Sequence, residues 1–429
     1  MGIAFVAGLG VGAGLTSLMR PQVSQLTPTG TATLEAPKYT TVSPARRKEV
    51  FKLGVVTFQT GAASIFGIPA LNAAQLLVDQ INQAGGILGA KVELVVRDES
   101  GGPDKMVAVY RELTQQAGVD AYVGLISSAD CLAVAPVAED IGTTLTVFFD
   151  CATKQLVDRG MMKKVTFRTG GTTVTDGVAL ARYVLEVMPD VKTVVGLNQD
   201  YAYGRDEWAD FKNALLTMKP DVKVLDELFT PLFATDYSAQ ISKILDLRPD
   251  LVHTSLWGPD LVNFIKQATA RGLFQQTRVA FARGEFGLYE GMPDDQIVEG
   301  PHYHGFPDPK AYYINRDFVE AYISRFGSPP PYPAYHMANA ILGVKYAFEV
   351  AAAVENVEWP DLSAVVKIFE RLAYATPGDY IIMTPNHNAM RGAVVGISKG
   401  GKLTALKYMH AAEVNPPVGV LSDQWVKSL

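Results

Sequence analysis

From residue 51 onward, the chain alternates between short apolar runs and longer stretches of helical periodicity. This alternation is typical of strand-helix-strand units built around parallel sheets. The runs that we expect to form strands are residues 52–58, 91–97, 120–126, 143–149, 191–197, 222–228, 251–255 and 279–282. A single open sheet rarely holds so many strands, so we predict an α/β protein with two doubly wound lobes.

The remaining segments of the body have the spacing of amphipathic helices and of one hairpin. The pattern becomes mainly helical after about residue 301 and ends in a hairpin at residues 392–397 and 402–408, around Gly400 and Gly401. The helices that we expect are residues 68–84, 107–116, 179–187, 261–270, 311–326, 333–354 and 361–372.

The first fifty residues differ from this body. Residues 3–19 are apolar and uncharged, and the run is at the short end of what spans a bilayer as a helix. We therefore predict that residues 1–20 are a signal peptide or membrane anchor, which places the body in the periplasm or outside the cell. Residues 21–50 are rich in Pro, Thr and Gly and are typical of a flexible linker.

A second interpretation of the same region is a dinucleotide-binding fingerprint at Gly8, Gly10 and Ala13, with Glu35 binding the ribose. That motif requires a second strand directly after its helix. The Pro- and Thr-rich segment does not supply one, which disfavours a nucleotide site.

Charge and motif searches exclude several other classes of function. The net charge is −6, with no clustered basic face to neutralise phosphates, so we expect no nucleic-acid partner. The sequence Gly396-Ile-Ser-Lys-Gly400 resembles a hydrolase elbow but falls in the expected hairpin instead of between a strand and a helix. His302 and His304 have too few neighbouring ligands for a metal. We therefore expect no enzyme activity, no metal and no cofactor.

The residues that follow the expected strands form the best candidate site, because ligands bind beyond the carboxyl ends of the strands in open parallel sheets. The first half of the chain offers small hydroxyl and backbone groups there, and the second half offers aromatic rings and a carboxylate. Such a set suits a small ligand with a polar head and an apolar part. The candidates are Phe66, Ser127, Ser128, Cys151, Ala152, Thr153, Tyr201, Tyr203, Trp257 and Glu285.

Several segments, in this order along the chain, resemble those of the leucine/isoleucine/valine-binding proteins of ABC transporters, which have the type I periplasmic binding fold. The resemblance runs from about residue 52 to about residue 409. The similar segments are Gly67-Ile-Pro-Ala-Leu-Asn-Ala-Ala74, Ile81-Asn-Gln-Ala-Gly-Gly86, Val96-Arg-Asp-Glu-Ser100, Gly124-Leu-Ile-Ser-Ser128, Tyr203-Gly204, Thr235-Asp-Tyr-Ser238 and Gly284-Glu285.

This resemblance implies two lobes joined by three chain crossovers, near residues 168–171, 300–305 and 380–387. The first lobe would comprise residues 51–168 and 305–382, and the second lobe residues 169–304 and 383–429. The fold implies a binding protein that closes on its ligand and delivers it to an ABC permease in the membrane. We expect a monomer or a weak dimer.

The resemblance also implies roles for the candidate residues. Ser128 would bind the carboxylate of an amino acid, helped by Thr153. The Ala152 carbonyl and Glu285 would bind the ammonium group. The aromatic rings of Phe66, Tyr203 and Trp257 would enclose the side chain, and the orientation of Tyr201 would help to set the size of the pocket.

Four charged residues depart from the family's pattern near the expected cleft, namely Asp130, Asp150, Asp200 and Arg283. One interpretation is that they face outward and form surface ion pairs. The other is that they adapt the site to a larger, cationic or more polar ligand. The alternative function is a ligand-sensing receptor module of the same fold, with an amide, urea or aromatic-acid ligand and a separate signalling partner.

Cys131 and Cys151 are the only cysteines, and both follow strands that we expect to be neighbours. In an exported protein such a pair suggests a disulfide, and in a cytosolic protein two buried thiols would be the default. The positions do not follow the disulfide usual in the similar family, so the resemblance does not decide between the two.

Overall fold

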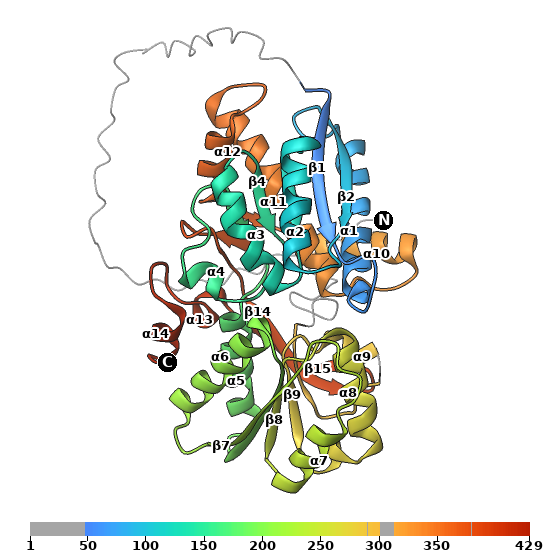
Figure 1. Cartoon of the computed structure of the whole chain (residues 1–429), viewed down its shortest axis with the longest axis vertical. Helices are drawn as coiled ribbons and strands as arrows, with labels where there is room; N and C mark the ends of the chain where they lie inside the picture. Colours follow the sequence, from blue (N-terminus) through green and yellow to red (C-terminus); the bar gives the residue numbers. More distant parts are fainter. Residues whose placement is uncertain (1–47, 290, 301–312, 379) are drawn as a thin grey trace, which may run out of the picture. The chain divides into compact units, whose positions relative to one another are not determined.

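The computed structural model describes residues 48–289, 291–300, 313–378 and 380–429 (Figure 1). The chain divides into two compact units, Met1–Ser43 and Pro44–Leu429, and every described residue belongs to the second. The predicted signal or anchor, most of the predicted linker, and His302 and His304 lie outside the described residues.

A five-stranded parallel sheet forms the centre of the first lobe, in the order β2-β1-β3-β4-β5. Its strands are β1 (Val50–Thr57), β2 (Lys91–Asp98), β3 (Ala121–Gly124), β4 (Leu145–Phe148) and β5 (Thr166–Arg168). Its helices are α1 (Ser64–Gln83), α2 (Pro103–Arg111), which continues as the π-helical turn η1 (Glu112–Gln116), α3 (Ser128–Ile141), α4 (Gln155–Asp158), α10 (Tyr313–Phe326), α11 (Tyr332–Glu355) and α12 (Leu362–Phe369).

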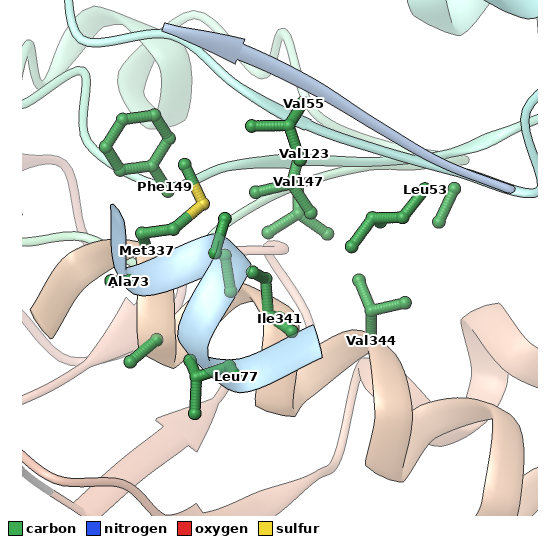
Figure 2. Close-up of a cluster of buried hydrophobic side chains, with 14 of the residues drawn as sticks. Leu53, Val55, Ala73, Leu77, Val123, Val147, Phe149, Met337, Ile341 and Val344 are labelled. Atoms are coloured by element: carbon green, nitrogen blue, oxygen red, sulfur yellow. The ribbon is translucent and has the colours of Figure 1, made fainter. Parts of the chain in front are cut away.

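The two faces of this sheet have separate cores. Helices α1, α11 and α12 pack on one face, and α2 and α3 pack on the other. Figure 2 shows the first of these cores, where Leu53, Val55, Val123 and Val147 of the strands point toward the side chains of α1 and α11. Burial on both faces explains the apolar character of the central strands β1, β3 and β4.

A small antiparallel sheet completes the first lobe. Its strands are β11 (Ala373–Ala375), β12 (Tyr380–Met383) and β13 (Ala389–Met390). Ile381, Met383 and Ala389 are buried in the same core as the helices of this lobe. The chain therefore leaves the first lobe at Arg391 and Gly392, after β13. This is later than the residue 382 boundary that the sequence predicts.

A seven-stranded mixed sheet forms the second lobe, in the order β15-β14-β10-β9-β8-β6-β7. Its strands are β6 (Thr193–Gln199), β7 (Lys223–Thr230), β8 (Leu251–Thr254), β9 (Arg278–Phe281), β10 (Ile297–Glu299), β14 (Ala393–Lys399) and β15 (Lys402–Met409). Its helices are α5 (Thr173–Val187), α6 (Ala202–Met218), α7 (Ser238–Leu247), α8 (Gly258–Ala270), η2 (Leu273–Gln275, a 3-10 turn), α9 (Glu285–Tyr289), α13 (Ala411–Val414) and α14 (Ser422–Val426). The β14–β15 hairpin is antiparallel, as predicted, and it contains Ser398 of the elbow-like motif.

The first crossover follows β5 and is held by Arg168, whose side chain is fully buried. Its Nε donates to Oδ1 of Asn388 at 2.8 Å, and its Nη1 donates to the carbonyls of Cys151 and Thr153 at 2.8 and 2.6 Å. One guanidinium thus ties the end of β5 to the loop after β4 and to the segment before β13. The second predicted crossover lies almost wholly outside the described residues.

Helix α11 is long and apolar enough to span a membrane, judged by length and composition alone. In its most apolar stretch, 61% of the residues are buried inside the protein. Its side chains Met337, Ile341 and Val344 belong to the core in Figure 2, which accounts for the apolar character of this helix.

Candidate functional site

A cavity lies beyond the carboxyl ends of strands from both lobes. The first lobe contributes residues after β3 and β4 and the first residue of α11, and the second lobe contributes residues after β6, β8 and β9. The lining residues are Ile126, Ser128, Asp150, Ala152, Tyr201, Tyr203, Trp257, Arg283 and Tyr332. Five of the candidates named from the sequence are therefore brought together: Ser128, Ala152, Tyr201, Tyr203 and Trp257.

Aromatic rings form the apolar part of this wall. The indole Nε1 of Trp257 donates a hydrogen bond to the Tyr201 hydroxyl at 2.8 Å. Phe66 meets the Trp257 ring edge-on at 5.2 Å between ring centroids. Phe66 itself is fully buried in the first-lobe core and is not among the residues that line the cavity. It supports the Trp257 ring from behind.

The start of α3 binds a carboxylate from the protein itself. The backbone N–H groups of Ile126 and Ser127 both donate to Oε1 of Glu99 at 2.8 Å, and the Ser127 hydroxyl accepts from the N–H of Asp130 at 3.4 Å as the helix cap. Burial of the Glu99 carboxyl group, together with the nearby Asp130, raises the pKa of Glu99 well above its usual value. Glu99 thus occupies the N–H groups of the two residues before α3, and the N–H of Ser128, the first residue of the helix, is not among its partners.

The polar groups of the loop after β4 also bind other residues of the protein. The N–H of Thr153 donates to the Ser128 hydroxyl oxygen at 3.3 Å, and the Thr153 hydroxyl donates to Asp206 of α6. Lys154 then pairs with Asp210 of α6 at 2.6 Å and with Asp423 of α14 at 2.5 Å. These contacts join the first lobe to the second beside the cavity.

Arg283, directly after β9, brings a positive charge into the second-lobe wall. It has a left-handed backbone conformation (φ 59°), and only 2% of the residue is exposed. Its Nη2 lies 2.7 Å from Oδ2 of Asp176, and its guanidinium lies 5.2 Å from the centroid of the Tyr332 ring. Burial alone would lower the pKa of Arg283, but the negative charges of Asp176 and Asp150 outweigh it and raise that pKa.

Two polar atoms in this part of the wall have no hydrogen-bond partner among the residues that the structure describes. They are Nη1 of Arg283 and the hydroxyl oxygen of Tyr203. Both residues line the cavity, and Tyr203 is 4% exposed. Buried donors without partners cost free energy, so they are the groups that a ligand would satisfy.

Asp150 is the negative charge of the first-lobe wall, and its side chain is 6% exposed. Its Oδ1 lies 3.5 Å from Nδ1 of His336 in α11. Burial raises the pKa of Asp150 to about 6, against the opposing effect of Arg283, Arg391 and Arg168. Burial and the same arginines Arg391 and Arg283 lower the pKa of His336 well below its usual value, so this imidazole is neutral at pH 7.

Glu285, the residue that the sequence assigns to the ammonium group, lies at the start of α9 and is fully buried. The described lining of the cavity does not include it, although its charge contributes to the raised pKa of Tyr332. Cys151 is paired with Cys131 as a disulfide, with Cα atoms 6.3 Å apart, and the described lining does not include Cys151 either.

The four charged departures from the family's pattern therefore differ in position. Asp200 forms an exposed ion pair with Arg205 at 2.6 Å, as the surface interpretation expects. Asp130 is buried in α3, whereas Asp150 and Arg283 line the cavity. Tyr332 was not foreseen as a wall residue, although the prolines at 329–331 mark the start of its helix. No cluster of His, Cys, Asp or Glu among the described residues could hold a metal.

Comparisons with known proteins identify the family and the fold of this chain. The family model described as "Periplasmic binding protein" matches residues 50–402. The chain is 30% identical over 208 residues to a Leu/Ile/Val-binding protein of Rhizobium johnstonii. That match covers 48% of this chain and 55% of the relative, so the aligned part spans about half the relative's length.

Two solved structures share the fold. One is the solute-binding protein of an ABC transporter from R. palustris in complex with benzoate, with a TM-score of 0.72, 20% identity, and coverage of 83% of this chain and 95% of that one. The other is the branched-chain amino acid transporter substrate-binding protein LivJ from Streptococcus pneumoniae in complex with isoleucine, with a TM-score of 0.72, 19% identity, and coverage of 84% and 99%.

Proposed function

Because the chain belongs to the periplasmic binding protein family, we propose that it is the extracytoplasmic solute-binding component of an ABC importer. It captures a small amino acid or a related compound in the cavity and delivers it to the permease. The observation that carries this proposal is the cavity itself, which takes its wall from the strand ends of both lobes and combines aromatic rings with a few buried polar groups.

The mechanism that we propose is closure of the two lobes on the solute. A solute held by the first-lobe residues Ser128 and Ala152 offers new contacts to Tyr201, Tyr203 and Trp257 of the second lobe. The closed arrangement is therefore stabilised only when both sides of the cavity are filled. The permease would recognise that closed arrangement.

The remaining candidate residues act behind this wall in our proposal. Phe66 supports the Trp257 ring, Ser127 caps α3, and Cys151 and Thr153 fix the loop after β4. The N-terminal segment would export or tether the protein, which would work as a monomer or a weak dimer. A sensing role for a signalling partner is the second candidate, supported only by the shared fold and by the aromatic acid bound in one of the similar structures.

Mass spectrometry of the small molecules released from protein purified without denaturation tests this function. We expect an amino acid or a related compound in near-stoichiometric amount, and its loss from a Trp257→Ala variant that still folds. If no small molecule copurifies, and neither benzoate nor any of the twenty amino acids raises the melting temperature, the proposed capture of a solute is wrong.

A further inference from the structure

We propose that the solute binds with its carboxylate on Arg283 and Tyr203 of the second lobe and its ammonium group on Asp150 of the first lobe. This is the reverse of the orientation that the family resemblance implies. The inference rests on the proposed function and names its ligand class, a small zwitterion such as an α-amino acid.

On the first-lobe side of the cavity, Ser128 keeps its own N–H and hydroxyl as spare donors, whereas the neighbouring donors are in use. The N–H groups of Ile126 and Ser127 already bind Glu99, and both the N–H and the hydroxyl of Thr153 already donate, to Ser128 and Asp206. A ligand carboxylate placed there would have only Ser128 to donate to it, unless it displaced these bonds. It would also lie beside the Asp150 carboxyl group, which lines the same wall.

The second-lobe side offers a charged donor that the first-lobe lining lacks. Nη1 of Arg283 and the hydroxyl of Tyr203 are buried, line the cavity and have no partner in the described part of the chain. The two groups are near enough for the charge of Arg283 to act on the ionisation of Tyr203. A guanidinium and a phenol hydroxyl together match a carboxylate, since each donates to one of its oxygens.

Asp150 supplies the matching negative charge across the cavity. Arg283 pairs with Asp176, and Asp150 lies against His336, so within the described residues the two opposite charges of the wall are not paired with one another. Because His336 is neutral at pH 7, it does not neutralise the charge of Asp150. A cationic group on the ligand is therefore the natural partner of Asp150, and the rings of Tyr201 and Trp257 remain for the apolar part.

The inference predicts selectivity for amino acids over simple aromatic acids. Benzoate can satisfy Arg283 and Tyr203, but it offers nothing cationic to Asp150. An α-amino acid satisfies both sides of the cavity.

Calorimetric titration of ligand-stripped protein tests the orientation. The probes are benzoate and whichever of the twenty amino acids most raises the melting temperature of the wild type. For the amino acid, we expect Arg283→Gln to weaken binding on the order of 100-fold, Asp150→Asn and Tyr203→Phe about tenfold each, and Glu285→Gln less than about threefold. For benzoate, Arg283→Gln weakens binding and Asp150→Asn leaves it equal or tighter.

Tyr203→Phe and Asp150→Asn preserve shape, so they keep the test valid if Arg283→Gln fails to fold beside Asp176. The orientation is wrong if Glu285→Gln abolishes amino acid binding while Tyr203→Phe and Asp150→Asn leave it unchanged, although solute capture would then stand. Binding of benzoate but of no amino acid would overturn the role of Asp150. No binding of either probe, with no copurified solute, would instead contradict the proposed function.

Discussion

The two lobes build their sides of the cavity in the same way, but the polar groups that they present to the cavity differ in kind. Each lobe brings a helix close to the end of its first strand through a glycine: a Cβ on Gly67 would lie 1.8 Å from the Phe58 carbonyl oxygen, and one on Gly204 would lie 2.1 Å from that of Gln199. Yet the first lobe uses most of its donors on Glu99, Ser128 and Asp206, while the second lobe leaves Arg283 and Tyr203 with unused donors. The shared fold thus places the wall, and individual side chains decide the polarity of the ligand.

The largest predicted effect is the loss of stability when the Phe66 ring, which contacts Trp257, is removed. Phe66→Ala removes a fully buried ring from the core, and we expect it to lower the free energy of unfolding by about 4 kcal/mol. Denaturant unfolding measures this loss. A loss below about 1 kcal/mol would show that Phe66 belongs to a ligand wall and not to the core.

The Cys131–Cys151 disulfide restrains the first-lobe side of the cavity, and the second lobe has no such covalent restraint. Cys131 and Cys151 enclose a segment with a sequence separation of 20. We expect the double variant Cys131→Ala/Cys151→Ala to lose about 3 kcal/mol of stability in oxidising buffer. The wild type in strong reductant should lose a similar amount. Equal stability of oxidised wild type and variant would indicate two free thiols in solution.

Lys154 tests the ionic contact that joins the two lobes. Burial raises the pKa of Asp210 to about 7, even with Lys154 opposing it. Lys154→Met should therefore cost about 2 kcal/mol at pH 8, where the buried carboxyl group must stay charged without a partner or take up a proton. A raised pKa in the folded state means that folding binds protons, so this loss should shrink as the pH falls toward 5.

Asp423→Asn is the matched control for that variant. Asp423 is the exposed partner of Lys154, with 60% of its side chain accessible, so its loss should cost less than about 1 kcal/mol. Equal losses for the two variants, measured by the same denaturant unfolding, would contradict the importance of the buried Lys154–Asp210 pair.

The pH dependence of binding gives the smallest effect and concerns Asp150 directly. Its charged and titratable neighbours are His336 and Tyr332 of α11, Tyr201 after β6, Arg283 after β9, and Arg168, Arg391 and Glu99. With a pKa of about 6 in the free protein, Asp150 becomes protonated as the pH falls below 6 and loses its attraction for an ammonium group. Affinity for an amino acid should therefore fall by up to about tenfold from pH 7 to pH 5.

Asp150→Asn separates this effect from the titration of other groups. The variant should bind the same amino acid more weakly at pH 7 but with a flatter pH profile between pH 7 and pH 5. A profile as steep as that of the wild type would assign the titration to another group.

The strands that lie in marked apolar runs could be predicted from the sequence, and the others could not. The eight predicted strands correspond to β1–β4 and β6–β9, of which the edge strands β2 and β7 are only partly buried. Strands β5 and β10–β13 have two to four residues and show no periodicity, so nothing local marks them. Their pairing is determined by the strands beside them.

From the sequence, only the site residues that follow strands could be predicted. Residues directly after strands, such as Ser128 and Tyr203, were found because the carboxyl ends meet at one edge. The sequence could not say which of Arg283 and Glu285 reaches the cavity, since that depends on the left-handed backbone at Arg283. Tyr332 comes from a helix distant in the sequence, and only the packing of α11 brings it to the wall.

A crystal structure of the wild-type protein with its copurified solute tests the central claim most directly. We expect the solute carboxylate within hydrogen-bonding distance, about 2.7–3.2 Å, of the Arg283 guanidinium and the Tyr203 hydroxyl, with its ammonium group at Asp150. A carboxylate bound to Ser128 and Thr153, with the ammonium group on Glu285, would contradict the proposed polarity of the two lobes.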